Sequence, residues 1–210
     1  MLEPISSDTE KRILVIGAGT GFVQVQDIAH YRIVGIVDRN KELVGTIINT
    51  IPVLGTPSDL RELFEKKEFT HAIISIGEPV PRAEYRVILQ ALKIPLVTVR
   101  DSMTKIGIGV TIGDGNLISA FCHFGAMSKV GKNNKFSSHC SIEHHAEVGD
   151  DCTFGPGVMT SGCVKIGSRV KFGTGIFIEP RITIGDDALI ASGSVIVKSV
   201  EAGEIVRRKT

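Results

Sequence analysis

The sequence lacks tryptophan, has few other aromatic residues and carries almost no net charge. Of its 210 residues, 24 are Lys or Arg and 23 are Asp or Glu, which gives a formal net charge of +1. A nucleic-acid-binding protein usually shows a basic excess, so this balance argues against one. No apolar run approaches the roughly 18 residues of a membrane-spanning helix. Aromatic residues make up only 5% of the chain, so Ile, Val, Leu and small residues must form the core.

Targeting and cysteine motifs are missing as well. The N-terminal segment 1–10 is short, acidic and polar, and it lacks the basic and apolar regions of a signal peptide. We interpret this segment as a disordered tail on a cytoplasmic protein. The four cysteines form no Cys-x-x-Cys pair, which excludes zinc-ribbon and thioredoxin-type motifs. In a reducing compartment we expect them to be small buried side chains.

The segment 11–100 alternates between apolar strands and helices. The predicted strands are 12–16, 32–37, 72–77 and 95–99, with a short extended segment at 46–55. Helices are predicted through Ile28, after a cap at Ser58, and over 85–92. Continuous apolar strands between helices indicate a parallel sheet covered on both faces. The first domain is therefore predicted to be an α/β domain of Rossmann-like type.

A glycine-rich loop joins the first strand to the first helix. It reads Gly17-Ala18-Gly19-Thr20-Gly21 and is shorter than the full dinucleotide-binding motif. Backbone N–H groups of such a loop can hold phosphate, and Asp38 at the end of the second strand suits a ribose hydroxyl. The domain has too few strands for both halves of a dinucleotide fold. A mononucleotide or nucleotide-sugar therefore fits it better than NAD, with a purely structural turn as the alternative.

From Ile106 onward the pattern becomes a six-residue repeat. An apolar residue recurs at sixteen consecutive positions up to Ile196, and Thr160 is the one polar member. The next position is glycine in nine of the sixteen repeats. A period of six fits a parallel β-helix, in which three strands and 18 residues make one coil. The sequence predicts a parallel β-helix over 104–202, followed by a tail at 203–210.

The register of the repeat predicts the direction of each side chain. Cys122, Cys140 and Cys152 occupy inward positions, so the repeat assigns them to the core. One outward column carries neither lysine nor carboxylate; it consists of His123, Ser141, Met159, Phe177 and Val195. An exposed, largely apolar stripe favours a symmetric homo-oligomer packed through this face. Packing of the N-terminal domain against the stripe is the alternative.

The middle coils contain the candidate catalytic residues. Four of the six histidines lie between 123 and 145, and Glu143 occupies a turn position that is mostly glycine elsewhere. His144 and His145 follow on the same turn. A histidine titrates near neutral pH and is a suitable general base when a carboxylate orients it. No Gly-x-Ser-x-Gly motif or activated cysteine is evident, which favours direct acyl transfer over a covalent intermediate. A solvated corner is the alternative interpretation.

Taken together, the features of residues 11–205 resemble bacterial nucleotide-sugar acetyltransferases of the PglD/NeuD type. The resemblance rests on the glycine loop, the strand that ends at Asp38, and the segments 142–149 and 162–167. It implies that the β-helix is left-handed and that the protein is a homotrimer, with acetyl-CoA in the groove between adjacent β-helices and a UDP-linked amino sugar on the N-terminal domain. His144 would be the base, with Glu143, His145 or Glu147 in support.

The resemblance also implies the binding residues. Gly19, Thr20 and Gly21 would hold the phosphates, Asp38 would contact the nucleoside, and Gly77 would lie near the same pocket. The acetyl-CoA groove would pass Thr153, Thr174 and Ser192, and no metal is expected. The chain departs from the family in its loop, in the acid after the base (here His145), at Thr153 and at its C-terminus. Three basic residues there could approach the coenzyme phosphates, or form a loose tail: Arg207, Arg208 and Lys209.

The predicted function is acetyl transfer from acetyl-CoA to an amino group of a UDP-linked sugar in bacterial glycan synthesis. One alternative is O-acetylation of a sugar such as sialic acid, and another is an inactive trimeric sugar-nucleotide binder. A third is a zinc enzyme resembling γ-class carbonic anhydrases, with His123, His139 and His144 as candidate ligands. The zinc alternative is disfavoured because the upstream histidine of that family is absent. Three ligands must also converge on the metal, whereas His139 and His144 lie on successive turns of the repeat.

Overall fold

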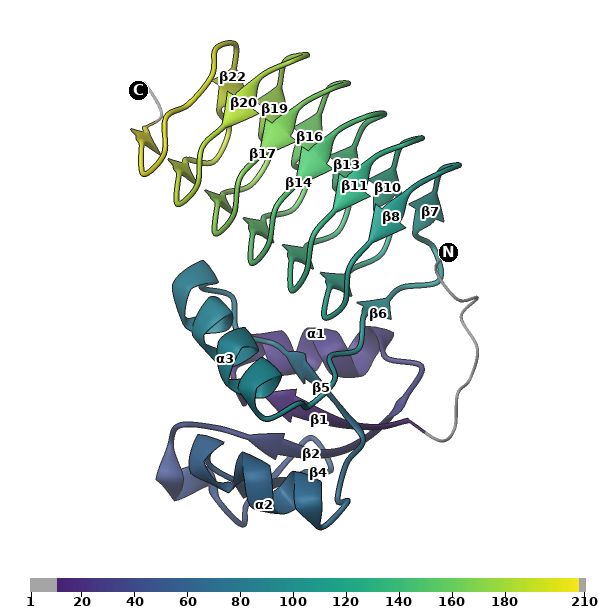
Figure 1. Ribbon diagram of the computed structural model, residues 1–210, viewed down its shortest axis with the longest axis vertical. Coiled ribbons are helices and arrows are strands. Elements are labelled where there is room, and N and C mark those ends of the chain that lie inside the picture. The colour runs from purple at the N-terminus through teal and green to yellow at the C-terminus, as the bar shows by residue number, and fades with distance from the viewer. Residues whose placement is uncertain (1–10, 208–210) are drawn as a thin grey trace.

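The computed structural model describes residues 11–207, which form two domains (Figure 1). The N-terminal sheet has the strand order β3-β4-β2-β1-β5, and only β3 is antiparallel to its neighbour. Its strands are β1 (Arg12–Ile16), β2 (Arg32–Val37), β3 (Ile47–Ile48), β4 (Ile51–Gly55) and β5 (His71–Ile74). Its helices are α1 (Thr20–Ile28), α2 (Leu60–Glu65) and α3 (Pro79–Ala91), with 3-10 turns η1 (Lys41–Leu43) and η2 (Pro57–Asp59).

Both faces of this sheet are covered, as predicted. Ile13 and Val15 pack in one cluster with residues of α1, whereas Leu14 and Ile16 pack with α2 and α3 on the other face. Alternate side chains of a strand point to opposite faces, so β1 is buried on both sides and its sequence is continuously apolar. The Rossmann-like prediction is confirmed.

Three local predictions for this domain are wrong. The segment 95–99 is not a full strand of the first sheet, because only Leu96 bridges to Ala72. Helix α3 begins at Pro79 rather than at residue 85. The turn before α2 is stabilised by a capping box between Thr56 and Asp59, not by Ser58.

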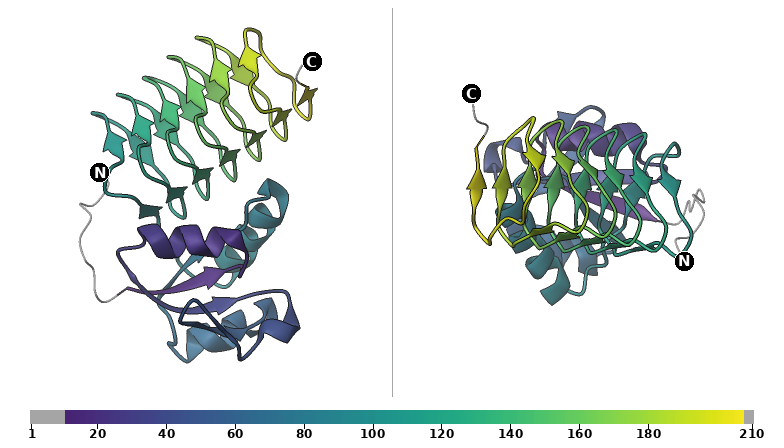
Figure 2. Two further views of the ribbon diagram at one scale, coloured as in Figure 1. Left: turned by 180° about the vertical axis from the view of Figure 1, so that it is seen from behind. Right: turned by 90° about the horizontal axis from the view of Figure 1, so that it is seen from above.

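The second domain is a left-handed parallel β-helix with three faces (Figure 2). The stripe face consists of β7 (Lys105–Ile106), β10 (His123–Phe124), β13 (Ser141–Ile142), β16 (Met159–Thr160), β19 (Phe177–Ile178) and β22 (Val195–Ile196). The lysine face consists of β8 (Thr111–Ile112), β11 (Lys129–Val130), β14 (Glu147–Val148), β17 (Lys165–Ile166) and β20 (Thr183–Ile184). The domain face, which turns toward the N-terminal domain, consists of β6 (Val99–Arg100), β9 (Leu117–Ile118), β12 (Lys135–Phe136), β15 (Thr153–Phe154), β18 (Lys171–Phe172), β21 (Leu189–Ile190) and β23 (Ile205–Val206).

The β-helix is longer than the expected range of 104–202. Strand β6 pairs with β9, so the first coil includes part of the segment that was assigned to the N-terminal domain. Strand β23 pairs with β21, so ordered structure continues into the expected tail at 203–210. Residues 208–210 and the expected tail at 1–10 lie outside the described residues.

The interior agrees with the predicted register. Cys122, Cys140 and Cys152 are at most 1% exposed and belong to a single core cluster. Phe136 stacks on Phe154, with 4.5 Å between ring centroids, because residues 18 apart lie directly above one another. Cys163 differs from the other cysteines and is partly exposed at a corner.

The corners of the prism use an unusual backbone conformation. Ten non-glycine residues between 121 and 187, including His145 and Asp151, have positive φ. They are separated from one another by six residues or a multiple of six. This left-handed conformation is costly for most residues, and Asn, Asp and Gly tolerate it best. The repeated glycines have another cause: a Cβ at Gly125 would lie 2.6 Å from the backbone nitrogen of His144 on the next coil. Glycine there permits the close stacking of coils.

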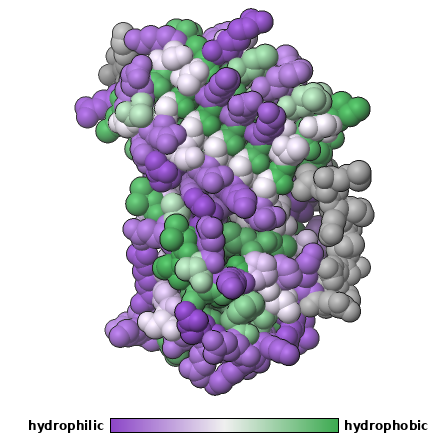
Figure 3. Space-filling model, viewed as in Figure 1, coloured by the Kyte–Doolittle hydropathy of each residue, from purple (hydrophilic) through white to green (hydrophobic). Residues whose placement is uncertain are grey.

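Hydrophilic side chains cover much of the β-helix in the view of Figure 3. On the stripe face, by contrast, Met159, Phe177 and Val195 remain 40 to 59% exposed. The N-terminal domain packs against the domain face instead, so the alternative explanation for the stripe is wrong. Within residues 11–207, the helices are too short or too polar to cross a membrane.

Candidate active site

A cavity of about 340 Å³ lies where β1, β2 and β5 end. Its wall contains all five residues predicted to bind the nucleotide-sugar. The lining residues are Gly17, Gly19, Thr20, Gly21, Asp38, Arg39, Ser75, Ile76, Gly77, Pro81 and Tyr85. In open parallel sheets the carboxyl edge of the strands is the usual place for a ligand.

Two helices begin at this cavity. The loop residue Thr20 opens α1, and Pro81 belongs to the first turn of α3; neither N-terminus has a side-chain cap. The uncapped N–H groups of α1 and the dipoles of both helices favour an anion at such a position, whereas Pro79 and Pro81 at the start of α3 carry no N–H. A Cβ at Gly21 would overlap the carbonyl oxygen of Ser75, so glycine is required for α1 to approach β5. The loop therefore combines close packing with an anion-binding geometry.

Asp38 holds the glycine loop in addition to lining the cavity. Its Oδ2 accepts a hydrogen bond of 2.7 Å from the backbone N–H of Ala18, and its Oδ1 accepts one of 2.9 Å from that of Asn40. Each carboxylate oxygen can accept a second hydrogen bond. Asp38 can thus bind a hydroxyl while it connects the loop to the end of β2.

Arg39 and Tyr85 also line this cavity, and sequence reasoning missed both. Arg39 Nε donates to the Tyr85 hydroxyl at 2.9 Å, and its guanidinium carbon lies 4.9 Å from the centre of the Tyr85 ring. Glu84 accepts a second hydrogen bond, of 3.0 Å, from Nη2. These hydrogen bonds raise the pKa of Arg39 above its usual value. The partners are more than forty residues apart, and no motif links them.

His144 and His145 lie at the corner between the stripe face and the lysine face, called here the His144 corner. Both side chains are exposed, and their Nδ1 atoms are 3.3 Å apart. A Cβ at Gly162 on the next coil would lie 2.5 Å from His144 Nε2, so the imidazole covers Gly162. The edge of the His144 ring that carries Nε2 therefore lies in the space that a side chain at position 162 would fill.

Glu143 does not contact His144. Its Oε1 accepts a hydrogen bond of 3.0 Å from Ser141 Oγ and lies 3.5 Å from His123 Nδ1. Glu147, the other acid considered as a support, lies 3.4 Å from Lys129. Of the three expected supports, His145 is the one in hydrogen-bonding contact with His144.

Thr160, the polar member of the repeat, contacts this corner from the interior. Its Oγ1 accepts a hydrogen bond of 3.0 Å from the backbone N–H of Glu143. The neighbouring strands β13 and β16 pair only through Ser141 and Met159, whereas the other stacked strands of the three faces pair at two positions. The ladder is thus interrupted where Glu143 replaces the usual glycine. Thr160 satisfies the backbone group that this interruption leaves.

The three candidate zinc ligands do not converge. His139 lies at the corner between the domain face and the stripe face, where it stacks on Phe121 with 4.9 Å between ring centroids. His144 lies at a different corner, and His123 contacts Ser141 and Glu143. Between residues 11 and 207, no three His, Cys, Asp or Glu side chains form a group that could hold a metal ion.

The expected acetyl-CoA residues are divided between two places. Thr174 and Ser192 lie on consecutive coils of the same corner as His139, called here the Ser192 corner, where Ser192 Oγ accepts a hydrogen bond of 2.9 Å from Thr174 N–H. Thr153 lies on the domain face instead. Its hydroxyl donates to the carbonyl oxygen of Gly77 at 2.6 Å and accepts from Arg82. The structure therefore places Thr153 against Gly77 in the wall of the cavity, and not beside Thr174 and Ser192.

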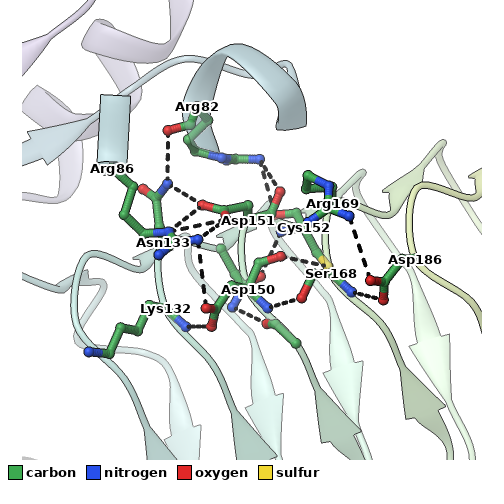
Figure 4. A network of polar contacts seen from close by, with 12 residues as sticks. Arg82, Arg86, Lys132, Asn133, Asp150, Asp151, Cys152, Ser168, Arg169 and Asp186 are labelled. Atoms are coloured by element: carbon green, nitrogen blue, oxygen red, sulfur yellow. Dashed lines mark hydrogen bonds and ion pairs between the residues drawn. The ribbon is translucent and has the colours of Figure 1, made fainter. Parts of the chain in front are cut away.

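A buried polar network fastens the two domains together at this point (Figure 4). Arg82, 1% exposed, donates to the carbonyl oxygen of Cys152 at 3.1 Å. Arg86 forms a forked contact of 2.6 to 3.1 Å with the carboxylate of Asp151, which also accepts from Asn133. Burial lowers the pKa of Arg82 to about 10, so its guanidinium remains charged at neutral pH. These residues lie far apart in the sequence, and sequence reasoning missed the network.

A second cavity, of about 440 Å³, lies at the C-terminal end of the β-helix. Its lining combines apolar residues such as Val195 and Val206 with the basic side chains of Lys198 and Arg207. Lys198 lies on the His144 corner, three coils beyond His144. Arg208 and Lys209, the other two basic residues considered for the coenzyme, lie outside the described residues.

Within one chain, the nucleotide cavity and His144 lie on opposite sides of the β-helix. The cavity adjoins the domain face through the contact between Gly77 and Thr153. The His144 corner joins the other two faces and points away from the N-terminal domain (Figure 1). The cavity and His144 of one chain therefore do not belong to one continuous site.

Comparisons with known proteins agree with this architecture. Residues 12–86 match the family model described as the PglD N-terminal domain. Perosamine N-acetyltransferase from Caulobacter crescentus, solved with CoA and GDP-perosamine, superposes with a TM-score of 0.86 at 22% identity, covering 92% of this chain and 91% of that one. No curated protein matches the chain.

Two further solved structures share the fold. The acetyltransferase domain of PglB from Neisseria gonorrhoeae FA1090, in complex with acetyl coenzyme A, has a TM-score of 0.83 at 24% identity over 93% of this chain and 95% of that one. WeeI from Acinetobacter baumannii AYE has a TM-score of 0.80 at 26% identity over 92% and 94%. Both domains of this chain are thus present in each of these proteins.

Proposed function

We propose, from a PglD-type N-terminal domain joined to a left-handed β-helix, that this protein transfers an acetyl group from acetyl-CoA to an amino group of a nucleotide-linked amino sugar. One observation carries the proposal. Five residues expected from the sequence to bind a nucleotide-sugar line one cavity, in a chain that also presents a hydrogen-bonded histidine pair on its β-helix. The Caulobacter relative takes a GDP-linked sugar, so the nucleotide is not restricted to UDP.

The cavity suits a nucleoside diphosphate. The loop of Gly19, Thr20 and Gly21 offers N–H groups to the diphosphate, and α3 contributes mainly through its dipole, because Pro79 and Pro81 carry no N–H. Asp38 retains acceptor capacity for a ribose hydroxyl. The carbonyl oxygen of Gly77 is held by Thr153, which fixes the wall of the cavity against the β-helix.

His144 acts as the general base in this proposal. When its Nδ1–H donates to Nδ1 of neutral His145, the lone pair of His144 Nε2 remains free. Nε2 takes a proton from the sugar amine as the amine nitrogen attacks the thioester carbonyl. The carbon–sulfur bond then breaks, and His144 returns the proton to the departing thiolate. His145 positions the ring, a task that a carboxylate performs in many such pairs.

The coenzyme is proposed to run along the β-helix axis from His144 toward the C-terminal cavity. Lys198 lies three coils beyond His144 on the same corner, about 14 Å away at the usual spacing of stacked strands. Lys198 and Arg207 supply positive charge for the coenzyme phosphates. Thr174 and Ser192, on the far side of the stripe face, are proposed to belong to the neighbouring copy's part of the groove.

A homotrimer is proposed to complete the site. Met159, Phe177 and Val195 are exposed, and turning the stripe face toward a threefold axis would cover them. In that arrangement the His144 corner of one copy meets the Ser192 corner of the next. The Ser192 corner borders the domain face, and therefore the side that carries the nucleotide cavity. The separation of base and cavity within one chain supports this assembly.

The test is release of free thiol from acetyl-CoA with a panel of UDP- and GDP-linked amino sugars. We expect acetylated amine as the product, and a loss of about 10²–10⁴-fold in kcat for His144→Asn. His30→Asn is the control, because His30 is an exposed histidine remote from both cavities. No thiol release with any panel member, or full activity of the His144 variant, would contradict the proposal.

A further inference from the structure

We propose that Arg39 is the platform on which the nucleobase of the substrate stacks. The inference rests on the proposed function and deepens it by naming the residue that recognises the base. Arg39 lines the cavity directly after Asp38, and its guanidinium is held against Tyr85 and Glu84.

The guanidinium of Arg39 is fixed before any ligand arrives. Nε is tied to the Tyr85 hydroxyl at 2.9 Å and Nη2 to Glu84 at 3.0 Å, while the Tyr85 ring lies 4.9 Å from the guanidinium carbon. Tyr85 is itself only 2% exposed, so its position is set by the core. A long side chain usually loses rotamer freedom on binding, and this arrangement lowers that cost.

The remaining surface of Arg39 is open to a ligand. Its side chain is 59% exposed although three contacts hold it. A guanidinium is planar and weakly hydrated, and it stacks well on flat π systems. Tyr85 occupies one side of the group, and the exposed remainder of the side chain is available to a second flat ring.

The order of groups along a nucleotide places the base at Arg39. The diphosphate is expected at the glycine loop and the starts of α1 and α3, and the ribose at Asp38. The base continues from the ribose in the direction away from the phosphates, and Arg39 is the next residue after Asp38. Nε and Nη2 of Arg39 already donate to Tyr85 and Glu84, so fewer of its N–H groups are available for a forked phosphate contact, while its stacking surface is unaffected.

The experiment measures the Kd of UDP, GDP and inorganic pyrophosphate by calorimetry on the whole protein. For Arg39→Ala we expect UDP and GDP to bind about tenfold more weakly, a typical effect of removing a stacking partner. Pyrophosphate affinity is expected to change no more than in Lys41→Ala, a control that removes the same charge two residues further along. Arg39→Lys is expected to behave like Arg39→Ala, because an ammonium has no planar face.

Tyr85→Phe tests the positioning of Arg39. The ring remains and the hydrogen bond to Nε is lost, so we expect a higher KM for the nucleotide-sugar with kcat and the thermal unfolding midpoint unchanged. A loss in kcat alone would contradict the positioning role.

The outcomes separate this inference from the proposed function. If Arg39→Ala weakens pyrophosphate as much as UDP and Arg39→Lys restores binding, Arg39 is a phosphate ligand and the platform is refuted. If the wild type binds nucleotides and both Arg39 variants bind equally well, the platform is also refuted while the proposed function stands. If the wild type binds neither UDP nor GDP, the proposed function itself fails.

Discussion

Replacing Asp151 by asparagine tests how the two domains are held together. Asp151 is completely buried and accepts a forked contact from Arg86, with the shortest distance at 2.6 Å. Its φ is +62°, a conformation that asparagine tolerates as well as aspartate, and the two side chains have nearly the same volume. The substitution therefore removes the charge while it preserves the backbone and the packing.

The expected cost is about 3 kcal/mol, the lower end of the range for removing one partner of a buried ion pair. The lower end applies because the Arg86 side chain is 21% exposed and Asp150 Oδ2 lies 3.8 Å from its Nη2, so water and Asp150 still stabilise part of its charge. The substitution also destabilises the charged form of Arg82. Arg82 loses the nearby negative charge of Asp151, while burial already lowers the pKa of Arg82. Asp187→Asn is the matched control: Asp187 also has positive φ and a forked contact with Arg169, but its side chain is 47% exposed. Its loss should be below about 1 kcal/mol.

Urea unfolding followed by two signals is the assay, since urea does not screen charges. Both tyrosines, Tyr31 and Tyr85, lie in the N-terminal domain, and the absence of tryptophan makes tyrosine fluorescence a reporter of that domain alone. Far-UV circular dichroism follows both domains. We expect the two transitions to coincide in the wild type and in Asp187→Asn, and to separate in Asp151→Asn. Equal losses in the two variants, or coincident transitions in Asp151→Asn, would refute the reasoning.

Two further predictions concern assembly and the base. Met159→Glu combined with Phe177→Glu should convert the oligomer to monomers, as measured by light scattering. Leu189→Glu is the control and should leave the oligomer intact, because Leu189 is as exposed as Met159 but lies on the domain face. An unchanged mass of the double variant would contradict the proposed interface. Gly162→Ala should lower kcat by at least about tenfold with little change in the unfolding midpoint, because the added Cβ displaces the His144 ring; wild-type kcat would show that the position of this ring is not critical.

The β-helix could be predicted from the sequence because its information is local. The inward and outward positions can be assigned within each six-residue repeat. Because three repeats make one coil, residues 18 apart are then expected to stack, without knowledge of any distant contact. The segment 95–99 shows the limit of this approach. Its apolar residues suit a strand in either domain, and pairing of Val99 with Leu117 decides the outcome.

The candidate site could be predicted only where a motif carried it. The glycine loop and the Glu143-His144-His145 turn are contiguous in sequence, whereas Arg39 meets Tyr85 and Arg86 meets Asp151 only after the chain has folded. Thr160 was visible as an exception in the repeat, but its purpose requires the interrupted ladder beside Glu143. The role of Thr153 at the domain contact likewise depends on a partner 76 residues away.

The uninterrupted six-residue spacing determines which insertions or deletions the β-helix could tolerate in evolution. Adding 18 residues between two coils lengthens the prism by one coil and leaves every later side chain on its own face. Adding six residues between Met159 and Gly162 would instead turn all later coils by one face. Met159 would then lie on a different face from Phe177 and Val195, and Gly162 would leave the position beneath His144. Length variation in such a protein is therefore expected in whole coils.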